Sequence, residues 1–266
     1  MRTKSLGVMA LVATLLAACG GGDEGGATRD PDDVVLQITS EGGFVPVEVA
    51  LNNGPRYTVF GDGRLVYQGA QIMIFPGPLV PSYMVARLSE SQLDAVLAMV
   101  ENIGLPDIED ETDDSAMNIV ADASTEVVTY WDENGEHRLG VYALGLEESP
   151  SARNEAFLEL ISTFDRFTGE AEAEPYAPER VRVLAGAGFV DPEFADTRPW
   201  PLEDTDFSDW SALDIGWQCT TLDGEVPAAF SDATQSTTWE PPAASADHEP
   251  LMLLVRPLLP GESDCP

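Results

Sequence analysis

The sequence predicts an α+β protein in which antiparallel hairpins pack with two helices and are followed by a small β-rich unit stapled by a disulfide. Three observations predict this fold class. Hairpin signals separate short apolar runs, two segments carry apolar residues at helical spacing, and two cysteines lie in a turn-rich C-terminal segment. An α+β domain is expected over 34–169 and the β-rich unit over 179–266.

Extended segments begin the folded part of the chain. Val34–Ser40 is rich in β-branched residues, which favours a strand. Tyr57–Phe60 and Arg64–Gln68 flank Gly61-Asp62-Gly63, and this three-residue connection predicts a hairpin because a glycine is available for its left-handed position. Tyr83–Leu88 is expected to form a further strand.

Asn134-Gly135 is the strongest short hairpin signal in the chain. A two-residue turn at this dipeptide predicts a register in which His137 faces Asp132. That pair is expected to be a surface ion pair rather than part of a Ser–His–Asp triad, because a turn edge offers no cleft and the sequence has no G-x-S-x-G motif. The register also predicts three strand pairs, which are Val128 with Val141, Tyr130 with Leu139, and Trp131 with Arg138.

Two helices are predicted from capping signals and apolar stripes. Ser89 and Gln92 form the S-x-x-Q capping box of the first, and Gly104 supplies its C-terminal stop. The second begins near Ser149-Pro150, with proline at or near the first helical position, and ends at Gly169. The expected core-facing residues are Leu93, Val96, Leu97 and Val100 in the first helix, and Phe157, Leu160, Ile161 and Phe164 in the second.

The chain changes character after an acidic, proline-containing linker at 170–178. Four of the five Trp lie in the last 67 residues, where they are expected to form core rather than a platform for sugar rings. Cys219 and Cys265 are predicted to form a disulfide that closes a loop of 46 residues. The strands expected in this unit are Arg180–Leu184 and Leu251–Val255.

The N-terminus carries an export signal. Two basic residues precede thirteen residues, Leu6–Ala18, that are predominantly apolar but too few to cross a bilayer. Leu16-Ala17-Ala18-Cys19 resembles the lipobox of bacterial lipoproteins, which implies cleavage before Cys19 and a thioether-linked diacylglycerol on its sulfur. The alternative is an ordinary signal peptide with a coincidental cysteine. A signal peptide is therefore assigned to 1–18, and a flexible Gly-rich linker to 19–33.

Composition excludes several chemistries. After residue 18 the chain holds 11 Arg, no Lys and 47 Asp or Glu, a formal charge of −36 that repels nucleic acid. P-loop, Schiff-base and S-x-x-K chemistry all need a lysine, so none is expected. His137 and His248 are the only histidines, so multi-His zinc and iron sites are not expected either. His248 is interpreted as a solvated loop residue.

An acidic run raises the question of calcium binding. Six carboxylates lie within eight residues, namely Asp107, Glu109, Asp110, Glu111, Asp113 and Asp114. Such a loop could supply oxygen ligands to Ca²⁺, but the spacing is not that of an EF-hand and the glycine of its sharp turn is missing. A solvated acidic loop is therefore favoured. Asp204, Asp206 and Asp209 form a second, smaller acidic group, which is also interpreted as part of a solvated loop rather than as a calcium site.

Four motifs, spread over nearly all of the mature chain, consist of turns and strand edges. They are Gly61–Arg64, Phe75–Pro78, Val141–Gly145 and Arg256–Glu262. These motifs resemble those of a family of uncharacterised lipoproteins from high-GC bacteria. The resemblance implies an envelope protein and brings no assigned activity.

The expected function is that of a lipid-anchored cell-envelope protein on the extracytoplasmic face of the membrane, with a non-enzymatic binding or structural ectodomain. The assigned site residues are Cys19 for the lipid and Cys219 with Cys265 for the disulfide, and no catalytic residue, metal ligand or cofactor is assigned. Expected partners are the membrane and an envelope protein or glycan, with divalent cations as a further candidate. The alternatives are a carboxylate-dependent hydrolase, which needs two acids about 5–10 Å apart, and a calcium-dependent binding module.

Overall fold

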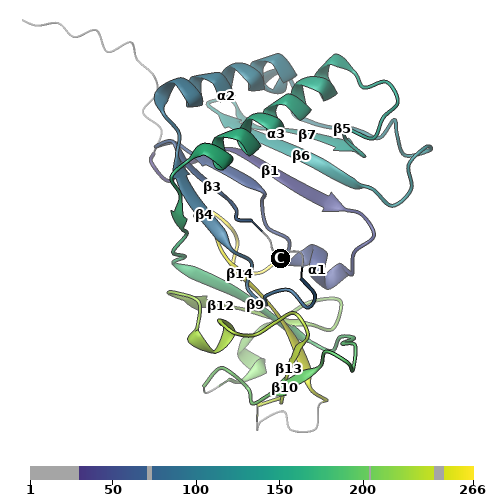
Figure 1. Cartoon of the computed structure of the whole chain (residues 1–266), viewed down its shortest axis with the longest axis vertical. Helices are drawn as coiled ribbons and strands as arrows, with labels where there is room; N and C mark the ends of the chain where they lie inside the picture. Colours follow the sequence, from purple (N-terminus) through teal and green to yellow (C-terminus); the bar gives the residue numbers. More distant parts are fainter. Residues whose placement is uncertain (1–29, 71–73, 204, 243–248) are drawn as a thin grey trace, which may run out of the picture.

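The computed structural model describes residues 30–70, 74–203, 205–242 and 249–266, and it confirms the α+β fold class. A sheet of eight strands carries two helices on one face, and a sheet of six strands lies at the opposite end of the molecule from these helices (Figure 1). The segments predicted to be strands and helices all form those elements, with ends that differ by a few residues.

The eight-stranded sheet has the order β5-β7-β6-β1-β2-β3-β4-β8. Neighbouring strands are antiparallel, except that β5 pairs with β7 in parallel. Its strands are β1 (Val34–Gly42), β2 (Tyr57–Phe60), β3 (Arg64–Gln68), β4 (Tyr83–Arg87), β5 (Asp110–Asp113), β6 (Ser124–Asp132), β7 (Gly135–Tyr142) and β8 (Glu174–Pro175).

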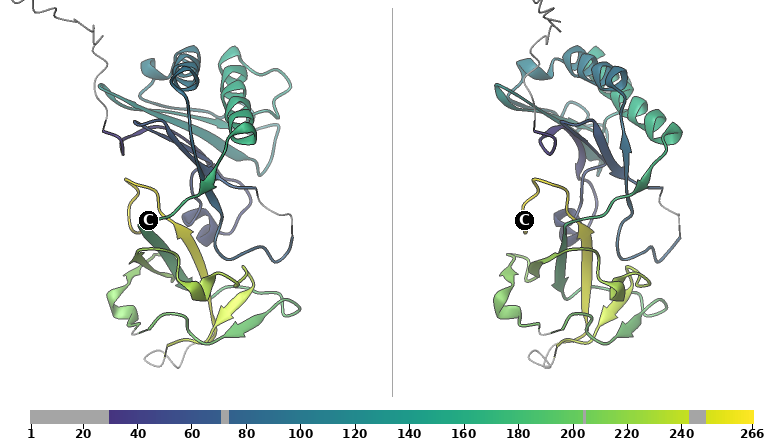
Figure 2. Two further views of the ribbon diagram at one scale, coloured as in Figure 1. Left: turned by 60° about the vertical axis from the view of Figure 1, so that its left-hand side comes forward. Right: turned by 90° about the vertical axis from the view of Figure 1, so that its left-hand side faces the viewer.

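Helices α2 (Glu90–Ile103) and α3 (Ala152–Glu170) lie side by side over one face of this sheet (Figure 2). The predicted capping box of α2 is present, and Gly104 ends the helix in the left-handed conformation with φ 81°. Ser151 caps α3, whose predicted stripe packs into the main core together with the apolar side of β1, β6 and β7. Among the described residues, no helix combines the length and the apolarity that a membrane span requires.

The register predicted for the β6–β7 hairpin is wrong by two residues. Asp132 pairs with Gly135, so the turn consists of Glu133 and Asn134 rather than Asn134 and Gly135. The Asp132 carboxylate accepts a hydrogen bond from the Asn134 N–H at 2.7 Å, and neither turn residue needs a positive φ. Because the shift is two residues, each side chain still points to the face that was predicted. The observed pairs are Val128 with Leu139, Tyr130 with His137, and Trp131 with Glu136.

The six-stranded sheet has the order β10-β13-β14-β9-β12-β11. The predicted Cys219–Cys265 disulfide is confirmed, with the two Cα atoms 6.0 Å apart. Trp217 and Trp239 are buried, as expected of core residues. The strands are β9 (Arg180–Gly186), β10 (Asp196–Arg198), β11 (Ser211–Ala212), β12 (Gln218–Asp223), β13 (Thr237–Trp239) and β14 (Leu251–Pro257). Short helical segments are α1 (Val47–Leu51) and the 3₁₀ turns η1 (Leu105–Asp107), η2 (Phe207–Asp209) and η3 (Ala228–Phe230).

The chain runs from the large sheet to the small one after α3, and its C-terminal end then returns to pack against the large sheet. Part of the stretch expected to be a linker, Glu174–Pro175, is the edge strand β8 and pairs with β4. The C-terminus lies between the two sheets in both sets of views (Figures 1 and 2). There Leu259 packs against Phe60, Val66 and Tyr83, on the face of the large sheet that the helices leave uncovered.

Candidate functional site

The described surface includes two grooves of a size that suits small ligands. The helix-side groove, of about 900 Å³, lies between the C-terminal half of α3 and the strands β1 to β4. The sheet-face groove, of about 1050 Å³, lies between β1, the β6–β7 hairpin and the C-terminal segment Pro260–Ser263. Both volumes are comparable with those of small-ligand sites, which are roughly 300–1,000 Å³.

Neutral polar side chains supply much of the lining of the helix-side groove. They are Ser40, Asn53, Gln68, Ser82 and Thr168, with the two tyrosines Tyr57 and Tyr67 beside them. The charged lining residues are Arg56, Glu126 and Asp165. The groove therefore combines hydrogen-bonding groups of both kinds, donors and acceptors, with a single cation.

Asp165 is held in place by two neighbours on β2 and the segment before it. Arg56 Nη2 donates to Asp165 Oδ1 at 2.9 Å, and the Tyr57 hydroxyl donates to the same oxygen. The Tyr57 ring stacks on Phe164 with the ring centroids 5.0 Å apart, which fixes the hydroxyl. Burial, followed by the hydrogen bond to Asp165, raises the pKa of Tyr57 to about 12, so this phenol stays protonated and remains a donor.

Tyr67 and Glu126 present further polar atoms to the helix-side groove. Only 8% of Tyr67 is exposed, and burial raises the pKa of its phenol. No described residue forms a hydrogen bond with the Tyr67 hydroxyl. Glu126 Oε1 accepts a hydrogen bond from Ser124 Oγ at 3.1 Å. The strand pairing of β1 with β6 places Glu126 next to Ser40 at the edge of the groove.

The sheet-face groove is acidic, but its less exposed carboxylates are engaged by neighbouring groups. Asp132 accepts hydrogen bonds from Asn134 and lies 3.0 Å from His137 Nε2. Glu262 accepts from Arg256 Nη1 at 2.8 Å and from the Leu259 N–H at 2.7 Å. Both carboxylates therefore form hydrogen bonds that stabilise the fold, and we assign neither of them a role in binding a substrate.

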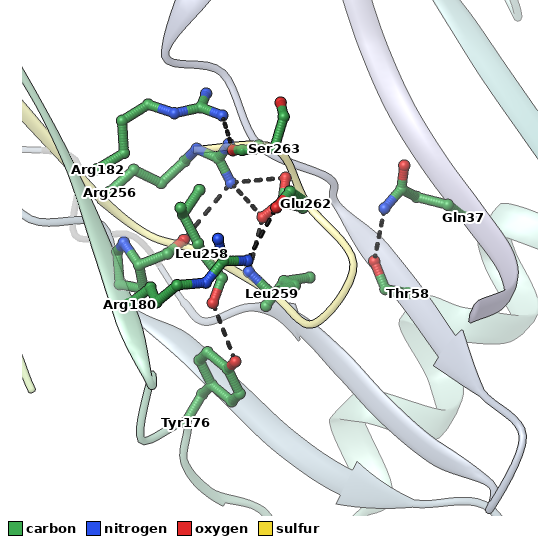
Figure 3. Close-up of polar contacts among 12 residues, drawn as sticks. Gln37, Thr58, Tyr176, Arg180, Arg182, Arg256, Leu258, Leu259, Glu262 and Ser263 are labelled. Atoms are coloured by element: carbon green, nitrogen blue, oxygen red, sulfur yellow. Dashed lines mark hydrogen bonds and ion pairs between the residues drawn. The ribbon is translucent and has the colours of Figure 1, made fainter. Parts of the chain in front are cut away.

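Three arginines clamp the C-terminal segment that forms one wall of the sheet-face groove (Figure 3). Arg182 donates to the carbonyl oxygens of Ser263 and Asp264 at 2.7 and 2.8 Å. Arg256 binds Glu262, and Arg180 donates to the Glu262 carbonyl at 2.8 Å. Figure 3 also shows the Tyr176 hydroxyl donating to the Leu258 carbonyl at 3.0 Å. This wall is thus held by arginine hydrogen bonds to backbone carbonyls and by one ion pair, between Arg256 and Glu262.

The predicted contact between His137 and Asp132 is present, but the expectation of a surface pair is wrong. The His137 side chain is 8% exposed, because η1 and Ile108 cover this part of β7. Its Nδ1 lies 2.7 Å from the Ile108 carbonyl oxygen, so both ring nitrogens face acceptors. The Ile108 carbonyl, followed by the hydrogen bond to Asp132, raises the pKa of His137. The pair is therefore a buried structural contact.

The central part of the acidic run, Asp110–Asp113, forms the strand β5 rather than the loop that was expected, while its side chains remain largely exposed to solvent, as expected. Asp110 pairs with Arg138 at 3.1 Å, Glu111 pairs with Arg153, and Asp113 accepts from Asn154 at 3.0 Å. β7 offers a free edge for this strand, on which Asp110 points to one face and Glu111 and Asp113 point to the other. Glu111 and Asp113 are each engaged by a partner of their own on α3. Within the described ranges, no group of three or more His, Cys, Asp or Glu side chains could hold a metal.

Several sequence predictions concern residues outside the described ranges. Cys19, with the signal peptide and most of the expected linker, lies before residue 30, and Asp204 and His248 also lie outside. The described members of the Asp204 group are Asp206, which caps the 3₁₀ turn η2 by accepting the Ser208 N–H at 2.8 Å, and Asp209 within that turn.

Comparisons with known proteins add no relatives. No family model matches the chain, and neither a curated protein nor a solved structure matches it. The candidate site therefore rests on the geometry of this chain alone.

Sequence reasoning missed the group formed by Arg56, Tyr57 and Asp165. Tyr57 and Asp165 are 108 positions apart and belong to β2 and α3. Asp165 follows Phe164 of the apolar stripe, so the sequence predicts that Asp165 lies at the edge of the buried face of the helix. The sequence does not predict which strand lies beside that edge.

Proposed function

We propose that this chain is a lipid-anchored protein of the cell envelope, on the extracytoplasmic face of the membrane, whose folded part binds a ligand without chemical catalysis. The lipobox-like segment ending at Cys19 motivates the anchor. The Cys219–Cys265 disulfide supports the compartment, since disulfides persist on the oxidising side of a membrane.

The observation that carries the binding function is the environment of Asp165 in the helix-side groove. A glycoside hydrolase needs two acids that converge, one of them made a better proton donor by a desolvated site. Asp165 instead has a half-exposed side chain, and it is held by Arg56 and Tyr57. A carboxylate oriented in this way is suited to accepting hydrogen bonds from a ligand. Binding is therefore favoured over hydrolysis.

The calcium-dependent alternative receives no support from the acidic run. The three carboxylates of β5 are each engaged by a different partner, namely Arg138, Arg153 and Asn154. We propose no metal-dependent role for this segment.

The anchor is tested by cell fractionation of Cys19→Ser in a bacterial host with the lipoprotein pathway. The protein as encoded should sediment with membranes and carry a diacylglyceryl group by mass spectrometry, whereas Cys19→Ser should lose both. Ser5→Ala, which leaves the lipobox intact, is the matched control and should stay in the membrane fraction. Membrane retention of Cys19→Ser without the lipid would contradict the proposal.

A further inference from the structure

We infer that the helix-side groove binds neutral sugar units of a glycan. This inference rests on the proposed binding function and names the ligand class of that site. It depends on four properties of the groove: its charge, its hydrogen-bonding groups, its size and the glycine at position 169 in its lining.

The first argument is charge. The mature chain has a formal charge of −36, yet the groove lining includes one arginine and two carboxylates among mostly neutral residues. The charge of Arg56 is balanced by Asp165, and Glu126 adds a second carboxylate, so the lining has no excess positive charge to attract a phosphate or a carboxylate of a ligand. The many other acids of the surface would attract a cation as readily as this groove does. The lining therefore suits an uncharged ligand.

The second argument is the type of hydrogen bond that the groove offers. Sugar hydroxyls both donate and accept, so they need donors and acceptors close together. Asp165 Oδ1 takes both protein donors, while no described residue donates to its Oδ2, which remains an acceptor for the ligand. The Tyr67 hydroxyl can donate or accept, and Ser82 beside it adds a second hydroxyl. Met84 adds an apolar wall for the C–H face of a sugar ring.

The third argument is the size of the groove and its openness at one end of α3. A volume of about 900 Å³ is near the upper end for small-ligand sites and has room for a short run of sugar rings rather than a single small molecule.

The fourth argument is Gly169, near the C-terminal end of α3. A Cβ at this position would meet no heavy atom within 4 Å, so packing does not require a glycine here. Glycine in a helix costs about 0.5–1 kcal/mol relative to alanine. Gly169 lines the groove, and its missing side chain leaves the groove wide at that point. A large side chain would fill the space that we assign to the ligand.

The test uses isothermal titration of the folded ectodomain, residues 19–266 with Cys19→Ser and the disulfide intact. The probes are four neutral tetrasaccharides, chitotetraose, cellotetraose, maltotetraose and mannotetraose. At about 10 mM, each would occupy roughly nine-tenths of a site with a Kd of 1 mM. We expect at least one to bind saturably, with an affinity that changes less than twofold when salt is added, because no charge is neutralised.

Matched variants assign that binding to the groove. Gly169→Trp and Asp165→Asn should each weaken it at least tenfold. Ala152→Trp places the same bulk at the exposed N-terminal end of α3, far along the helix from the groove, and should leave the affinity unchanged. Circular dichroism and urea unfolding of each variant exclude a loss of fold as the cause.

Three results would overturn the inference: no binding of any probe, binding that Gly169→Trp and Asp165→Asn both leave intact, or binding abolished by moderate salt. Each of these leaves the membrane anchoring of the full chain unaffected. Failure of the ligand class is thereby distinguished from failure of the proposed lipid anchor, which fractionation of Cys19→Ser measures.

Discussion

Arg182 and Arg256 lie directly opposite each other on β9 and β14, and both are almost completely buried. Burial, followed by the charge of Arg256, lowers the pKa of Arg182 to about 10. The two guanidinium groups are stabilised differently, because Arg256 binds the Glu262 carboxylate and Arg182 donates to backbone carbonyls near the C-terminus. Together they hold the end of the chain between the two sheets.

Glu262→Gln should destabilise the protein strongly. The substitution keeps the size of the side chain but removes the carboxylate bound to the buried Arg256 guanidinium, and breaking a buried pair costs about 3–5 kcal/mol. Glu111→Gln, which breaks the more exposed pair with Arg153, should cost less than about 1 kcal/mol. Urea unfolding measures both. Similar losses for the two variants would show that the Arg256–Glu262 pair has no special role.

Removal of the disulfide should lower stability by about 3–4 kcal/mol, the cost expected for a 46-residue loop. The change is the double substitution Cys219→Ser and Cys265→Ser, measured by thermal and denaturant unfolding. The arginine contacts to Ser263 and Asp264 remain in this variant, so the native fold should persist at 25 °C. Free thiols in the purified, non-reduced protein would contradict the pairing.

Stability should fall as the pH rises through the raised pKa of His137. The protonated imidazole donates to the Ile108 carbonyl and to Asp132, so the folded pKa lies above the unfolded value of 6.5. This contribution is fully present below pH 6.5 and is lost as the pH rises through the folded pKa. His137→Gln removes the titrating group. The difference in unfolding free energy between the two proteins should therefore shrink over this window, and a constant difference would refute the assignment.

Two glycines beside helix ends should respond to alanine in opposite ways. Gly104 has φ 81°, so Gly104→Ala should cost about 1–2 kcal/mol although a Cβ would meet nothing there. Gly169 lies within α3 with open space around it, so Gly169→Ala should stabilise the protein by up to about 0.5–1 kcal/mol. Urea unfolding of both variants provides the comparison, and destabilisation by Gly169→Ala would show that the helix needs the glycine.

The elements predicted most accurately from the sequence are those specified by residues a few positions apart. The capping box of Ser89 and Gln92, the stop at Gly104 and the first hairpin all depend on local hydrogen bonds and on one backbone conformation. The second hairpin shows the limit of this reasoning. There the turn chemistry of Asp132 competed with that of Asn134-Gly135, and the side-chain hydrogen bond of Asp132 decided the register.

Long-range partners could not be predicted, because charge patterns do not specify which acid meets which arginine. A loop was expected for the acidic run, but part of it forms β5 because β7 provides an edge for pairing. Arg153 and Asn154 of α3 provide partners for its side chains. His137 was expected at the surface because the cover provided by η1 does not follow from the hairpin sequence.

The sequence by itself determined the fold class, the main helices and strands, and the pairing of Cys219 with Cys265, because each follows from short-range geometry or from the small number of cysteines. Only the tertiary structure decided where Asp165 meets Tyr57 and how Arg182 and Arg256 hold the C-terminal segment. The physical reason is that burial of the apolar faces brings distant segments together. The polar side chains at the edges of those faces become neighbours only after the core has formed.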